Sequence, residues 1–156
     1  RKDGEGAGMT AASHTMTGGC LCGAVRFKAV RQNQEVGACH CSMCRRWTAG
    51  PFLVVDCGDT LKIDDRSNLG VYRSSEWAER AFCKSCGTPL YYRLIGRESY
   101  FVSAEAFDER AGYALTNEIF IDEKPAYYEF ANKTHKMTGA EVFAAFGPPE
   151  ADPTKS

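Results

Sequence analysis

The sequence predicts a mainly β protein with little helix, and two observations lead to this fold class. Most of the short hydrophobic runs alternate apolar and polar side chains with a period of two, which is typical of strands that bury one face. Clusters of Gly, Asp, Asn and Ser separate these runs, as turns between strands require. A chain of 156 residues can bury a core of its own, so small packed sheets are expected to form without help from disulfides.

Seven strands are expected along the chain. The clearest is GAVRFKAV at residues 23–30, where Val25, Phe27 and Ala29 fall on one face of the strand. Runs of the same kind predict further strands at residues 51–57, 60–64, 70–74, 89–95, 99–104 and 118–122. No repeat or break in composition divides these segments, so they are expected to belong to one domain.

Helix signals occur at two places. The segment CSMCRRW is able to open a short helix after Cys41. Thr138 and Glu141 have the spacing of a capping box, which predicts a helix over residues 138–146. Two prolines shortly after this segment end the helix, because proline lacks the backbone N–H that a helix needs.

The domain is expected to span residues 10–147. Residues 1–9 are interpreted as a disordered lead or cloning remnant, and residues 148–156 as a frayed tail. No run approaches the roughly 18 apolar residues of a membrane span, so a cytoplasmic protein with no membrane partner is expected. The 19 basic and 20 acidic residues nearly cancel, which argues against nucleic acid and favours small-molecule partners.

The eight cysteines fall into groups whose spacing suggests metal binding. In a reducing compartment, clustered thiols are more often metal ligands than disulfides. The groups are a first pair (Cys20, Cys22), a triplet (Cys39, Cys41, Cys44), the single Cys57 and a second pair (Cys83, Cys86).

The two pairs together supply the four thiolates of a closed tetrahedral zinc site. Cys20 and Cys22 would join Cys83 and Cys86, which form a Cys-x-x-Cys turn that ends at a glycine. Four-sulfur zinc sites have no open position, and their role is structural. The alternative is a redox dithiol at Cys83 and Cys86, but the βαβ pattern that accompanies such dithiols is absent from the sequence.

The triplet supplies three thiolates and leaves one coordination position open. Catalytic zinc sites keep such a vacancy for water or substrate, so Cys39, Cys41 and Cys44 are the candidate catalytic ligands. Two alternatives stay open: Cys57 or His40 closes the site and makes it structural, or the triplet binds no metal. A lone cysteine such as Cys57 is most often a plain buried thiol.

An open three-thiolate zinc suits a soft incoming ligand. A thiol that enters the fourth position is deprotonated well below its free pKa of about 8.5. Arg45 and Arg46 follow the triplet and could bind the carboxylates of an anionic thiol such as glutathione, or could form a solvated basic turn. Four aromatic residues could line a pocket, although core packing is the commoner role of such residues: Trp47, Trp77, Tyr91 and Tyr92.

Five segments follow one another in the order of a known family. They are GGCLCGAVRF, CHCSMCRRW, FCKSCGTPLYYR, VSAEAFDE and IFIDEKPAYYEF, and they span Gly18 to about Phe130. In these motifs the chain resembles the glutathione-dependent formaldehyde-activating enzymes, a zinc family that includes centromere protein V-like proteins. The resemblance implies an Mss4-like fold of small antiparallel sheets, a structural zinc on the two cysteine pairs and a catalytic zinc on the triplet.

The resemblance also implies a reaction. Glutathione would add to formaldehyde and give S-(hydroxymethyl)glutathione, so the chain is expected to be a zinc-dependent carbon–sulfur lyase. The alternative is a non-catalytic zinc module of Mss4-like fold that binds another protein. A module whose structural zinc is complete has no need of Cys39, Cys41 and Cys44, which favours the enzyme. A nucleic-acid or microtubule role ranks last, because the chain has no basic extension.

Overall fold

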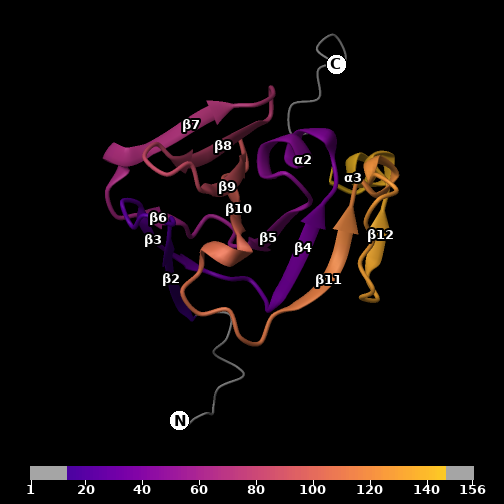
Figure 1. Ribbon diagram of the computed structural model, residues 1–156, viewed down its shortest axis with the longest axis horizontal. Coiled ribbons are helices and arrows are strands. Elements are labelled where there is room, and N and C mark those ends of the chain that lie inside the picture. Colours follow the sequence, from indigo (N-terminus) through magenta and orange to yellow (C-terminus); the bar gives the residue numbers. More distant parts are fainter. Residues whose placement is uncertain (1–13, 147–156) are drawn as a thin grey trace.

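The fold is mainly β, as the sequence predicts. A computed structural model describes residues 14–146, where the strands form one sheet of eight and one of three, with α-helices at Ser42–Thr48 (α2) and Gly139–Phe146 (α3) (Figure 1). The predicted lead at 1–9 and tail at 148–156 lie outside the described residues, as do both ends of the predicted domain.

The larger sheet runs across the molecule in the order β12 (His135–Met137), β11 (Ala114–Ile119), β4 (Glu35–Cys39), β5 (Phe52–Asp56), β10 (Ser99–Ser103), β9 (Pro89–Leu94), β8 (Ala78–Cys83) and β7 (Leu69–Arg73). Neighbouring strands are antiparallel, except that β11 pairs parallel with both β4 and β12. These two pairs depart from the expected antiparallel arrangement. Parallel neighbours require a long crossover connection, and the period of a strand carries no information about where the chain returns.

The smaller sheet contains β2 (Thr15–Gly19), β3 (Arg26–Val30) and β6 (Lys62–Ile63). The predicted alternation in this region is confirmed, because Val25, Phe27 and Ala29 are all buried in the core. The Phe27 ring meets Phe107 edge to face, with 5.5 Å between the ring centroids. A β-carbon on Gly18 would lie 2.4 Å from the Ala106 carbonyl oxygen, so only glycine lets β2 approach this turn.

The structure contains strands that the sequence pattern did not reveal: β2, β4, β8 and β12. The strand expected at 118–122 overlaps β11 (Ala114–Ile119) only at Glu118 and Ile119, so its predicted bounds are wrong. Phe120 then takes a left-handed conformation with φ of 57°, and a 3₁₀ turn, η4, follows at Ile121–Glu123. Further 3₁₀ turns occur at Arg66–Asn68 (η2) and Ala104–Ala106 (η3).

Both predicted helices are present, and both begin with a side-chain cap. Cys41 is the N-cap of α2, where its sulfur accepts a hydrogen bond from the backbone N–H of Cys44 at 3.4 Å. The capping box of α3 forms as expected. The Glu141 amide donates to the Thr138 hydroxyl at 3.1 Å, and the Thr138 amide donates to the Glu141 carboxylate at 2.8 Å.

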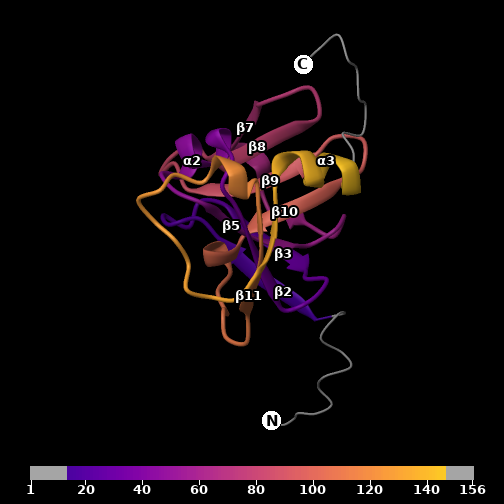
Figure 2. The same cartoon turned by 90° about the vertical axis from the view of Figure 1, so that its right-hand side faces the viewer.

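The arrangement of the elements separates two ends of the molecule. Both helices lie at one end of β4 and β11, whereas β2 and β3 lie toward the other end (Figures 1 and 2). Within residues 14–146, no helix combines the length and the apolar character that crossing a bilayer requires. The cysteines lie at or between the ends of strands, and two residues separate β4 from α2.

Candidate functional site

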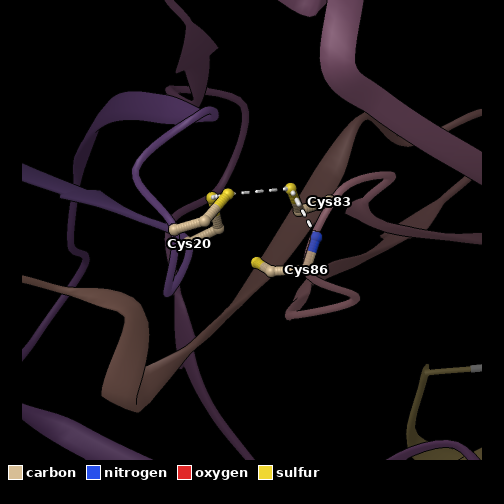
Figure 3. A group of neighbouring side chains, drawn as sticks. Cys20, Cys83 and Cys86 are labelled. Atoms are coloured by element: carbon tan, nitrogen blue, oxygen red, sulfur yellow. Dashed lines mark hydrogen bonds between the residues drawn. The ribbon is translucent and has the colours of Figure 1, made fainter.

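The two cysteine pairs come together from two hairpins of different sheets. Cys20 and Cys22 lie between β2 and β3, while Cys83 ends β8 and Cys86 lies before β9. The four sulfur atoms all lie within 4.8 Å of one another, and Figure 3 shows Cys20 facing Cys83 and Cys86 from a separate segment. We call these residues the four-cysteine group. It joins the smaller sheet to the larger one.

The sulfur separations match the size of a zinc site. The distance from Cys22 Sγ is 3.7 Å to Cys20 Sγ and 3.8 Å to Cys83 Sγ. A tetrahedron with Zn–S bonds of about 2.3 Å has edges of about 3.8 Å. The four-cysteine group is therefore compatible with zinc in both its donor atoms and its dimensions.

Hydrogen-bond donors surround the sulfur of Cys83. The amides of Ser85 and Cys86 donate to it at 3.3 and 3.4 Å, and the Asn68 side-chain amide donates at 3.1 Å. The Thr88 hydroxyl and neighbouring backbone amides lower the pKa of Cys86 to about 5. Donors of this kind stabilise thiolates, the form in which cysteine binds metals.

The triplet forms a second group. Cys39 ends β4, Cys41 caps α2 and Cys44 lies in the first turn of α2; their three sulfurs lie within 4.8 Å of one another. We call these residues the three-cysteine group. Hydrogen bonds from Cys39 and Cys44 lower the pKa of Cys41 to about 2, and the hydrogen bond with Cys41 raises the pKa of Cys39. A metal ion that binds here displaces the protons that remain.

Within residues 14–146, no histidine, carboxylate or further cysteine places a ligand atom in the three-cysteine group. This contradicts both alternatives in which a fourth side chain, Cys57 or His40, closes the site. Cys57 is fully buried in the core of the β scaffold, and burial raises the pKa of its thiol to about 12, which makes it an inert thiol. His40 is also fully buried, and both of its ring nitrogens have other partners.

His40 belongs to a buried polar network that supports the three-cysteine group. Its Nε2 donates to the Glu118 carboxylate at 2.7 Å, and its Nδ1 is hydrogen-bonded to the Tyr128 hydroxyl at 2.8 Å. The Thr134 hydroxyl donates to the other Glu118 oxygen at 2.6 Å. Because His40 stands between Cys39 and Cys41 in the chain, this network fixes the backbone between two of the three sulfurs.

The network predicts an acid-sensitive contribution to stability. Burial raises the pKa of Glu118, but the hydrogen bonds from Thr134 and His40 outweigh burial and lower it below its ordinary value. A carboxyl whose pKa is lowered by folding contributes stability that is complete above its unfolded pKa, about 4.3, and is lost as the pH falls through the folded pKa.

We therefore expect Glu118→Gln to lower the free energy of unfolding by about 1–3 kcal/mol at pH 7, because a buried charge-assisted bond is lost. The difference from wild type should shrink below about pH 4. Urea unfolding of both chains at several pH values measures this difference. The exposed Glu35→Gln is the control, and equal losses in the two variants would contradict the assignment.

The structure separates the two arginines that follow the triplet. Arg45 Nε donates to the backbone carbonyl of His40 at 2.8 Å, so its guanidinium is held at the turn between Cys39 and Cys41. Arg46 is exposed. Side chains adjacent on a helix point about 100° apart, so the two guanidinium groups do not share one direction.

The four aromatic residues pack against other side chains. Tyr91 is buried against Tyr100, and Trp77 packs against Phe143 of α3. Trp47 and Tyr92 also contact Arg80, a residue near the site that sequence reasoning missed. Arg80 occurs in the AERAFC segment, where a charged residue in a strand is ordinarily taken as exposed.

Comparisons with known proteins agree with the motifs. A sequence model described as glutathione-dependent formaldehyde-activating enzyme matches residues 15–123. An uncharacterized lyase of Schizosaccharomyces pombe is 40% identical over 126 residues, which cover 80% of this chain and 92% of that protein.

Two further matches are more distant. A Halomonas elongata protein that is named as a putative glutathione-dependent formaldehyde-activating enzyme is 29% identical over 85 residues, or 49% of this chain and 54% of that protein. A crystal structure of a Rhodobacter sphaeroides protein superposes with a TM-score of 0.53 at 25% identity, covering 60% of this chain and 88% of that one. From the extent of the family match and the identity to the yeast protein, this chain belongs to the glutathione-dependent formaldehyde-activating enzyme family.

Proposed function

We propose that this protein is a zinc-dependent carbon–sulfur lyase that joins the thiol of glutathione, or of a related thiol, to a small aldehyde such as formaldehyde. One observation carries the proposal. The chain brings three sulfurs together with no fourth ligand atom from residues 14–146, although its other group already has the four sulfurs that a structural site needs. A protein that used zinc only for folding would need the four-cysteine group alone.

In this proposal the two groups have different roles. Cys20, Cys22, Cys83 and Cys86 hold a structural zinc that ties the β2–β3 hairpin to the β8–β9 hairpin. The residues Cys39, Cys41 and Cys44 hold a second zinc. When bound there, zinc would lower the pKa of an entering thiol and keep it as a thiolate.

The proposed reaction balances without a redox cofactor. The thiol sulfur forms a bond to the aldehyde carbon while the π bond of the carbonyl breaks, and the proton released by the thiol ends on the carbonyl oxygen. The product is a hemithioacetal, which for formaldehyde is the S-hydroxymethyl adduct, and the reverse step breaks the same carbon–sulfur bond. An unhindered aldehyde needs little acid assistance, so positioning and thiol ionisation provide most of the rate gain.

The chain's own residues would position the thiol. Arg45 and the His40–Glu118 network hold the backbone that carries Cys39 and Cys41. Arg46, exposed on α2, is the guanidinium that remains available for a carboxylate of glutathione. A carboxylate contact at an exposed site contributes about 0.2–1 kcal/mol.

We accordingly expect Arg46→Ala to raise the KM for glutathione about two- to fivefold, with little change in kcat. The increase in KM should be smaller for a thiol without carboxylates, such as 2-mercaptoethanol. Steady-state rates with both thiols measure it. Lys62→Ala, which removes an exposed cation from β6, is the control, and an equal KM change in both variants would exclude a specific role for Arg46.

The proposal is tested by zinc analysis together with a direct assay for the adduct. Purified protein should contain two zinc ions per chain, and it should accelerate formation of S-(hydroxymethyl)glutathione from labelled formaldehyde, followed by NMR. One zinc per chain, with no acceleration and no response to glutathione, would instead favour a non-catalytic zinc module.

A further inference from the structure

A buried cation lies against the three-cysteine group. Arg80 on β8 is 3% exposed, and its Nη1 donates to the sulfur of Cys44 at 3.4 Å. Cys44 is 2% exposed, so this contact is shielded from water. β8 also supplies Cys83 to the four-cysteine group, and the same strand therefore serves both groups.

Two aromatic rings hold the guanidinium in place. The Cζ atom of Arg80 lies 5.2 Å from the ring centroid of Trp47 on α2 and 5.0 Å from that of Tyr92, its partner across the strands. A planar guanidinium can stack on aromatic faces, whereas the compact ammonium of lysine cannot do so in the same way. The rings thus fix the orientation of Arg80 beside Cys44.

The buried charge of Arg80 has no carboxylate partner among the ion pairs of residues 14–146. Its Nε is buried and makes no hydrogen bond with the described part of the chain. The side-chain group that accepts from it is the sulfur of Cys44, at 3.4 Å from Nη1, in the three-cysteine group. A buried cation is costly unless an anion compensates it, so Arg80 is explained by negative charge on these sulfurs.

Charge counting shows what the cation would do. Three thiolates and one divalent zinc leave a net charge of minus one, which is unfavourable in a buried site. Arg80 cancels this charge, so that a further anion, the thiolate of the substrate, can approach a neutral centre. Without Arg80 the substrate thiolate would approach a centre that is already negative.

We propose that Arg80 is the fixed counter-ion of the three-cysteine centre, a positioning residue that strengthens its hold on a divalent metal and on an anionic thiolate. The inference rests on the proposed function, since it assumes a metal at this group. It adds that compensation of the substrate's thiolate charge comes from β8, in addition to the carboxylate contact proposed for Arg46.

Cobalt titration of the full chain tests the inference, because sulfur-bound Co²⁺ absorbs visible and near-ultraviolet light. Wild type should bind two Co²⁺, and a Cys41→Ser chain gives the reference spectrum of the four-cysteine group alone. Arg80→Met and Arg80→Gln should lower the Co²⁺ affinity of the three-cysteine group about 10- to 100-fold, as substitutions of residues beside metal ligands typically do. The affinity of the four-cysteine group should not change. Arg80→Lys, which keeps the charge, should recover most of this loss.

Glutathione is then added to the cobalt-loaded chains. Binding of its thiolate should change the sulfur-to-cobalt charge-transfer band. Wild type should show this change at a lower glutathione concentration than Arg80→Gln does. Arg93→Met is the matched control: Arg93 lies on the neighbouring strand and pairs with Glu79 and Glu98, and its loss should leave both Co²⁺ affinities unchanged.

The outcomes separate the two proposals. Two Co²⁺ ions bound equally well by wild type and by both neutral Arg80 variants would overturn the counter-ion role and leave the proposed function standing. One Co²⁺ per wild-type chain would overturn both. Equal weakening of the two sites in Arg80→Gln, without recovery in Arg80→Lys, would show a general structural role and also overturn the inference.

Discussion

Cys83→Ser is expected to abolish stable folding of the chain. Cys83 is fully buried, its sulfur accepts hydrogen bonds from three donors, and it belongs to the four-cysteine group that joins the two sheets. Zinc on four thiolates supplies on the order of 10 kcal/mol to folding. That is comparable with the whole stability of a typical domain, about 5–15 kcal/mol. Circular dichroism and zinc analysis of the purified variant should show an unfolded or aggregated chain without bound metal.

Cys57→Ala is the matched control for this prediction. Cys57 is as deeply buried as Cys83, but it lies in neither cysteine group. Its replacement should cost only about 1 kcal/mol, as typical point substitutions do. A Cys83→Ser chain that melts within a few degrees of Cys57→Ala would show that the four-cysteine group does not hold the sheets together.

Cys41→Ser is expected to give the opposite result: a folded chain that lacks the second metal and the activity. Serine is a preferred N-cap residue, so its hydroxyl replaces the sulfur that caps α2. The backbone at this turn is also held by His40 and Arg45, which do not depend on the thiol. Melting should therefore stay close to wild type, the zinc content should fall from two to one, and adduct formation should fall to the uncatalysed rate.

Comparison of the two serine variants tests the division of roles directly. Cys44→Ser serves as a second variant of the three-cysteine group and should behave like Cys41→Ser in zinc content and activity. If Cys41→Ser and Cys83→Ser were unfolded to the same extent, the assignment of one structural and one catalytic centre would be wrong. Full activity in a Cys41→Ser chain that binds one zinc would exclude the three-cysteine group as the site of reaction.

Much of the fold follows from local patterns. The alternation at residues 23–30 predicts β3, because strand residues of one face are buried together, and Val25 and Phe27 lie in the core. The capping box at Thr138 and Glu141 predicts α3, because its two hydrogen bonds are local. The spacing of the cysteines likewise suggests two groups, although their metal-binding roles stay predictions.

Other features could not be predicted from the sequence patterns, for physical reasons. The segment AERAFC of β8 contains an irregularity in pairing between Ala81 and Phe82, which breaks the period of two. Glu118 looks like a surface residue in sequence, yet it is 1% exposed because His40 and Thr134 supply its hydrogen bonds. Whether a charged residue is buried depends on partners far away in the chain.

The sequence by itself determined the fold class, the family and the set of thiols able to bind metal, because alternation, turns and close cysteine spacing are local properties of the chain. Only the tertiary structure decided which side chains surround each group. It placed Cys57 in the core, gave both nitrogens of His40 other partners and brought Arg80 beside Cys44. The physical reason is that burial and charge compensation arise from contacts between strands distant in sequence, and no local pattern specifies those contacts.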